Sequence, residues 1–117
     1  MTQRTAQLEP KTAGVAALRA QAEHCRPRFS PLAQQWRRDT LHFSRISRKV
    51  AHPAYRQIIA MGEAVVPLIL EALRDHPTHW FAALKTITGV DPIRAGSNPV
   101  LAREAWLEWG RTQGLVD

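Results

Sequence analysis

The feature that most constrains the fold is a dense apolar run in the middle of the chain, AVVPLILEALRD at residues 64–75. Large aliphatic side chains occupy positions 65, 66, 68, 69, 70 and 73, too many for the single stripe of a surface helix. We therefore expect a core helix that is contacted on more than one side. Because a proline deep inside a helix removes a hydrogen bond and clashes with the preceding turn, this helix should begin near Glu63 or Ala64, which places Pro67 in or just after its first turn.

Proline and glycine mark the helices on either side of this run. Pro53 suits a first helical position and Gly62 suits the position just past a helix end, so a helix over 53–61 is predicted. The sequence DHPT at 75–78 predicts a tight break, because the residue before a proline avoids the α region. A third helix is expected from about His79 to Ile87 or Thr88, with Gly89 ending it.

The flanking segments predict further helices. A short helix is expected from Thr12 to Cys25, ended by Pro27, and Ser30–Pro31 is typical of a new helix start. Whether residues 44–51 continue that helix or form another is left open. Residues 90–99 are loop-like in composition, and a last helix over 100–112 carries two tryptophans. This pattern predicts an N-terminal arm and short helix at 1–25 and a single helical domain at 26–117.

The expected fold class is therefore all-α, a compact stack of five to six short helices. In the middle of the chain, Gly62 is followed by the apolar run from Ala64 to Leu73, a short turn and a second apolar helix at 82–87. This part of the chain resembles a HEAT-type helical hairpin repeat. Such hairpins stack on one another and need neighbouring helices to complete their core. The resemblance implies a HEAT-like right-handed stack.

A second resemblance covers roughly residues 32–114. The chain is similar to a small bacterial family with a Trp and a Thr upstream of several short motifs, and this similarity implies no particular activity. The matching residues are Trp36, Thr40, HPAY (52–55), MG (61–62), PLIL (67–70), WF (80–81), ITG (87–89) and AWLEWG (105–110).

Length and composition limit the class of protein. A chain of 117 residues is one domain by size. No apolar run approaches the ~20 residues that cross a bilayer, and the first residues lack the apolar segment of a secretory signal. The lone Cys25 cannot form an internal disulfide, which agrees with a reducing compartment. We therefore predict a cytoplasmic protein with no membrane partner; nothing in the sequence predicts its oligomeric state.

Positive charge is concentrated in one segment. Residues 26–56 carry a net charge of +7, whereas residues 1–25 carry +1 and residues 57–117 carry −2, out of +6 for the whole chain. If the helices of this segment bury their apolar faces, its arginines face solvent, where their fields add and attract phosphate backbones or an acidic protein surface. The predicted anion-binding or nucleic-acid-binding residues are Arg37, Arg38, Arg45, Arg48, Lys49 and Arg56. Pairing with the acidic C-terminal half would instead remove this patch.

Two other polar sets have the residue types of a functional site. Thr40, Ser44 and Ser47 have helical spacing, and His52 could serve one of them as a base; hydroxyls beside an apolar face more often cap a turn, and His52 suits a helix start. His76 and His79 could share a metal ion, but no further ligands accompany them at zinc-like spacing. We therefore expect no catalytic residue, metal or cofactor.

Binding without catalysis is the predicted function. The first hypothesis is a basic face that engages a nucleic-acid backbone without reading its sequence. The alternative is a protein–protein adaptor, for instance the neutralising partner of a neighbouring gene product, in which the arginines form a steering rim around an apolar groove. The helical scaffold fits both hypotheses and separates neither.

Overall fold

A computed structural model describes residues 10–76, 79–93, 96 and 98–116, and within them the side chains from residue 14 onward. This part of the chain contains six α-helices and no strand, which confirms the all-α prediction. In chain order the elements are α2 (Pro10–Asp39), α3 (Ile46–Val50), α4 (Pro53–Ala60), the 3₁₀ helix η1 (Gly62–Val65), α5 (Val66–Asp75), α6 (Phe81–Thr88) and α7 (Pro99–Thr112).

The N-terminal half differs from the prediction, because α2 is one helix of 30 residues with Pro27 and Pro31 inside it. The expected break at residues 26–28 is wrong, and the expected boundary between residues 25 and 26 falls in the middle of this helix. Both prolines lie on the exposed side of α2, where water can reach the carbonyl groups that they leave without a helical donor. The opposite side carries a continuous buried stripe of Ala22, Phe29, Ala33 and Trp36, which holds the helix together across the prolines.

The central helices follow the prediction closely. α4 begins with Pro53 in its first turn, and Gly62 directly after it has a φ of 78°, which favours glycine. The apolar run then opens with η1 and continues as α5, with Pro67 in the first turn of α5. Six of the ten residues of α5 are buried, so it is the core helix that the sequence predicts.

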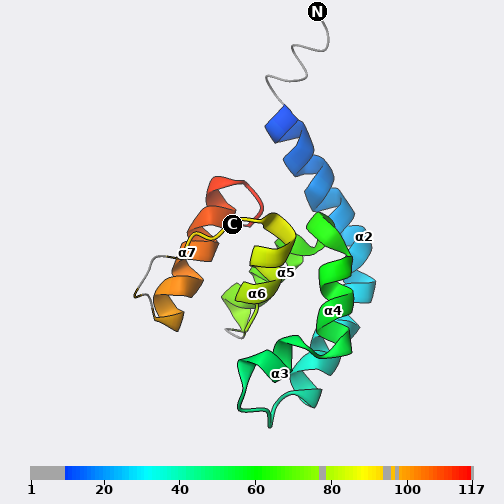
Figure 1. Cartoon of the computed structure of the whole chain (residues 1–117). Coiled ribbons are helices and arrows are strands. Elements are labelled where there is room, and N and C mark those ends of the chain that lie inside the picture. Colours follow the sequence, from blue (N-terminus) through cyan, green and yellow to red (C-terminus); the bar gives the residue numbers. More distant parts are fainter. Residues whose placement is uncertain (1–9, 77–78, 94–95, 97, 117) are drawn as a thin grey trace, which may run out of the picture.

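α5 and α6 lie between two outer layers (Figure 1). One layer is formed by α2 with α4 alongside it, and the other by α7, which packs against α5. α3 lies at one end of the molecule, beyond the last turns of α2. None of the helices in the described ranges combines the length and the apolar character needed to cross a membrane.

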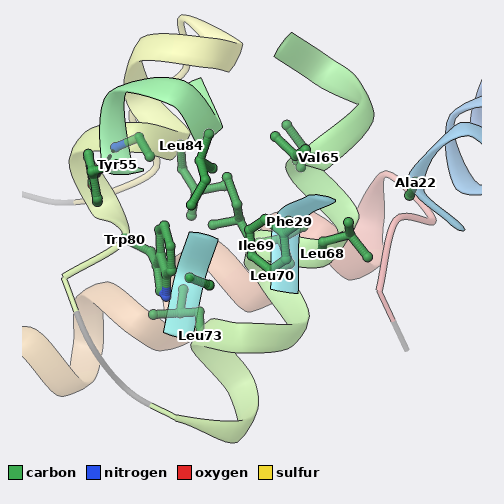
Figure 2. Close-up of a cluster of buried hydrophobic side chains, with 14 of the residues drawn as sticks. Ala22, Phe29, Tyr55, Val65, Leu68, Ile69, Leu70, Leu73, Trp80 and Leu84 are labelled. Carbon is green, nitrogen blue, oxygen red and sulfur yellow. Dashed lines mark hydrogen bonds between the residues drawn. The ribbon is translucent and has the colours of Figure 1, made fainter. Parts of the chain in front are cut away.

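Aromatic rings occupy the centre of the core beside the aliphatic side chains of α5 (Figure 2). The ring centroid of Trp80 lies 4.7 Å from that of Trp36, 5.4 Å from that of Tyr55 and 5.9 Å from that of Phe29. These four residues come from α2, from α4 and from the residue preceding α6, so one cluster of rings joins three segments that are distant in the sequence. Trp106 on α7 is also fully buried, and Trp109 contacts it edge-on, as expected for tryptophans that cover the core.

Candidate nucleic-acid interface

The six predicted anion-binding residues lie on three consecutive elements and the loop between them. Arg37 and Arg38 are in the last turn of α2, Arg45 directly precedes α3, and the other three are on α3 and α4. We call residues 37–56 the basic lobe. Its elements lie together at the end of the molecule that carries α3 (Figure 1).

A core tryptophan fixes the shape of the basic lobe. The indole Nε1 of Trp36 donates a hydrogen bond of 2.7 Å to the backbone carbonyl of Lys49, and a turn closed by the bond from Phe43 N to the Thr40 carbonyl reverses the chain between α2 and α3. The exposed guanidinium of Arg48 lies 4.8 Å from the centre of the Phe43 ring. These contacts hold α3 against the end of α2 although α3 buries no residue of its own.

The six cations differ in exposure. Arg38, Arg45, Arg48 and Arg56 are exposed, whereas Arg37 and Lys49 are partly buried. The pKa of His79 is lowered, mainly by burial of its imidazole and in addition by the positive charge of nearby Lys49. The positive charge of Lys49 therefore also acts on His79, which lies just before α6.

None of the six predicted residues forms an ion pair within the described part of the chain. Counting ion pairs between described residues, Arg26 is the only lysine or arginine of the basic segment 26–56 that is neutralised, by Glu23 at 2.7 Å and by Glu71 at 3.0 Å. The predicted loss of the patch through pairing with the C-terminal half is thus limited to Arg26. Arg28 is exposed on α2 and likewise makes no ion pair, and it extends the set of uncompensated cations beyond the six.

Acidic side chains show the complementary pattern. Among the described residues, every acid except Glu63 contacts a basic group, and within the basic lobe the only acid, Asp39, bonds to His52. The remaining ion pairs use Arg26, Arg74, Lys85, Arg103 and Arg111, all outside the basic lobe. The basic lobe therefore keeps five more positive than negative charges, and none of its six lysine and arginine side chains lies within ion-pair distance of a carboxylate in the described chain.

The cations surround the end of α2 and do not form one flat face. Arg37 lines the groove between α2 and α5, together with Gln34 and Asp75. Asp39, two residues further along the helix, faces α4, because it contacts His52 at the start of that helix. Since residues two apart project from nearly opposite sides of a helix, Arg37 and α4 flank α2 on different sides.

In the predicted polar set, Thr40 and His52 form hydrogen bonds that hold the local backbone in place. Thr40 is buried and its hydroxyl donates to the Trp36 carbonyl at 2.6 Å. His52 caps α4: its Nδ1 accepts a bond from Ala54 N, and its Nε2 lies 3.0 Å from a carboxylate oxygen of Asp39. Because Nδ1 accepts, the proton of a neutral ring is on Nε2 and is donated to Asp39. Ser44 and Ser47 are exposed in the basic lobe, and neither contacts the imidazole of His52.

The two histidines considered as metal ligands, His76 and His79, are not joined by a third ligand. In the described ranges no group of three or more His, Cys, Asp or Glu side chains is placed so that it could hold a metal ion. Comparison of the chain with protein-family models, with curated proteins and with solved structures gave no match. The resemblances to HEAT-type hairpins and to a small bacterial family therefore stay predictions.

Proposed function

We propose that the protein binds nucleic-acid backbone without catalysis, through the uncompensated cations of the basic lobe and Arg28. The single observation that supports this proposal is the division of charge: within the described chain, no lysine or arginine between residues 28 and 56 has an ion-pair partner, whereas the acids outside the basic lobe, except Glu63, contact cations that also lie outside it. Such cations neutralise phosphates and release the counterions condensed on a duplex, which supplies most of the free energy of binding without sequence recognition.

The kind of cation in the basic lobe supports the same function. Arginine predominates over lysine there, and its planar guanidinium binds phosphate oxygens through two hydrogen bonds. The arrangement of the cations around the end of α2 suits contacts with several phosphates, which position a protein on a duplex without reading its bases.

Fluorescence anisotropy of a labelled duplex, measured over a range of salt concentrations, tests this proposal. If about four phosphates are neutralised, the logarithm of the association constant should fall with the logarithm of salt concentration with a slope near −3.6. The charge-reversal variant R38E/R45E should lose at least ~10-fold in affinity, because each exposed arginine contributes one such contact.

A matched control variant separates the contribution of the basic lobe from that of the total net charge. Lys85 and Arg111 are exposed, lie outside the basic lobe, and pair with Asp91 and Glu108. The variant K85E/R111E changes the net charge by the same amount as R38E/R45E and should lose much less affinity. Affinity that is independent of salt, or equal losses in the two variants with both still folded by circular dichroism, would reject the proposal.

An acidic protein surface is the second candidate partner, and one observation favours it. Leu41 and Ile46 are exposed inside the basic lobe, and apolar side chains add nothing to phosphate contacts but would be covered by a protein. The variant L41S/I46S should weaken a protein complex and leave duplex affinity unchanged. The ratio of absorbance at the nucleic-acid and protein maxima, before and after a high-salt wash, separates the two candidates in purified material.

A further inference from the structure

The exposed large apolar side chains of the described chain fall into two groups, one beside unpaired arginines and one beside glutamates. Leu41 (72% exposed) and Ile46 (54%) lie in the basic lobe, whereas Val100 (66%) and Leu101 (55%) lie in the first turn of α7. Single exposed aliphatic residues are ordinary, but pairs of them beside charges of one sign indicate surfaces suited to a partner of the other sign.

Leu101 of the second group lines a groove along α7. Its walls are residues at helical spacing on α7 together with one residue of the segment after α6, namely Pro92, Leu101, Glu104, Ala105, Glu108, Trp109 and Thr112. The floor is apolar, and the charged groups along it are two carboxylates. The groove therefore suits an aliphatic side chain flanked by cations.

The two carboxylates are weakly held by their own chain. Glu104 lies 3.6 Å from Arg103 and Glu108 lies 3.3 Å from Arg111, in pairs whose acids are more than half exposed. Exposed pairs of this kind contribute ~0–1 kcal/mol at most, so an incoming guanidinium can replace the present partner at little cost. Arg103 also donates to the carbonyl groups of Leu73 and Arg74, which keeps its guanidinium turned toward the end of α5.

The first group has the matching composition. Residues 41–48, which we call the corner, carry Leu41 and Ile46 together with Arg45 and Arg48. Both arginines are exposed, and neither forms an ion pair with another described residue. The corner thus presents aliphatic side chains between unpaired cations, as the α7 groove presents an apolar floor beside carboxylates.

We propose that the protein associates head-to-tail with a second copy of itself, the corner of one copy docking into the α7 groove of the next. A second copy is the occupant that the charges favour, because each surface carries what the other lacks. A symmetric dimer through either surface alone would place arginine against arginine or glutamate against glutamate. Head-to-tail contact leaves one corner and one groove free, so it continues into a ring or an open chain.

The association is expected to be weak and to compete with nucleic acid. Two small surfaces of this kind belong to the lower range of protein interfaces, below about 1,200 Å² of total buried area, where complexes are transient. Arg45 and Arg48 serve both partners, so added duplex should disperse the assembly. The inference does not rest on the proposed nucleic-acid function, since self-association is measured without any nucleic acid present.

Two double variants, each of which replaces an aliphatic residue by a charged one and reverses one charge at exposed positions, test the proposal. I46E/R45E removes the corner and keeps the groove, whereas L101K/E104K removes the groove and keeps the corner. Sedimentation velocity on nucleic-acid-free protein at low salt should show the mean mass of the wild type rising with concentration and each variant remaining monomeric. An equimolar mixture of the two variants should form a one-to-one dimer and nothing larger, because each supplies the surface that the other has lost.

The mixture distinguishes head-to-tail contact from the other occupants of the groove. Continued self-association of either variant alone would indicate a symmetric contact. A wild type that stays monomeric at every concentration would indicate that a different protein, or nothing, covers the groove. Each of these outcomes overturns the proposal. A monomeric wild type that still binds duplex in a salt-dependent manner would overturn this inference and leave the proposed function intact.

Discussion

The indole nitrogen of Trp36 binds the backbone carbonyl of Lys49 across 2.7 Å, and this bond joins the core to the basic lobe. The Trp36 ring is itself buried, 5.1 Å from the ring of Tyr55. α3 contributes no buried residue, so its place beside α2 depends on this donor and on the turn at residues 40–43. The position of Arg48 is therefore set by the packing of the aromatic cluster.

Replacing Trp36 with phenylalanine should measure the strength of this link. The W36F variant removes the donor and leaves the Lys49 carbonyl with a longer bond of 3.3 Å from His52 N. Trp106 provides the matched control, because it is equally buried and its Nε1 has no hydrogen-bond partner among the described residues. Urea denaturation should show W36F less stable than W106F by about 1 kcal/mol, the net value of one hydrogen bond. Equal losses would mean that the bond contributes nothing.

The hydroxyl of Tyr55 has a structural role that composition does not reveal. It accepts a bond from Ala83 N and donates one to the His79 carbonyl, each 2.9 Å long. Trp80, the residue that precedes α6, offers no side-chain cap, so the tyrosine hydroxyl from α4 satisfies a donor in the first turn of that helix. The Y55F variant should lose about 1–3 kcal/mol of unfolding free energy in urea titrations, because a buried N–H loses its acceptor. A neutral substitution would show that water replaces the hydroxyl.

The same residue makes a prediction about alkaline pH. Burial raises the pKa of Tyr55 to about 12, above the ordinary value of 10.0. The folded state therefore holds the phenolic proton more tightly than the unfolded state, so this stabilisation is complete below pH 10.0 and is lost as pH rises toward about 12. The loss should approach 1.4 kcal/mol per pH unit in that window. Y55F, which lacks the only tyrosine, is the control for lysine titration.

Phenolate absorbance follows the same titration directly, since one tyrosine gives one transition. A transition near the ordinary value of 10.0, with the protein still folded, would contradict the burial of the hydroxyl. A wild type whose stability falls between pH 10 and 12 no faster than that of Y55F would contradict it as well.

Local chemistry explains which helix boundaries could be predicted from the sequence. Pro53, Gly62 and Gly89 each act on their own backbone, one through a fixed φ and two through a left-handed conformation, so their effect does not depend on distant residues. The burial of α5 followed from its composition for the same reason. These features placed the ends of the central helices within three residues of their positions in the structure.

The prediction failed where tertiary contacts decided the outcome. Pro27 and Pro31 break an isolated helix, but a buried stripe that continues on the other side of α2 outweighs their cost. The pair between Arg26 and Glu71 spans 45 positions, and no local pattern indicates it. Likewise, the total charge of residues 26–56 follows from the sequence, whereas the placement of Arg37 in the α2–α5 groove depends on how two helices pack.

Pro31, inside α2, is expected to lower the free energy of unfolding. Pro31 cannot donate to the Pro27 carbonyl, so the P31A variant restores one helical bond and removes a clash with the preceding turn. Part of this gain is offset by the greater freedom of the unfolded chain, and a net stabilisation of about 1–2 kcal/mol is expected. P53A is the control, because Pro53 occupies a first helical turn where no bond is missing, and it should give no gain. Stabilisation of both variants alike would show that helix strain at Pro31 is not its cause.

The contact between α7 and α5 leaves no room for a side chain at Gly110. A Cβ atom there would lie 2.7 Å from Leu70 Cδ1 and 2.8 Å from Val116 Cγ1, and Leu70 is fully buried in the core helix. Alanine at position 110 gains about 1 kcal/mol of helix propensity but should cost more through overpacking, so a net loss of roughly 1–2 kcal/mol is expected in thermal or urea unfolding. Gly14 is the matched control, a helical glycine with nothing within 4 Å of the added atom, where G14A should be neutral or stabilising. If G110A is as stable as G14A, Leu70 and Val116 can move aside, and the close packing of α7 on α5 does not restrict this position.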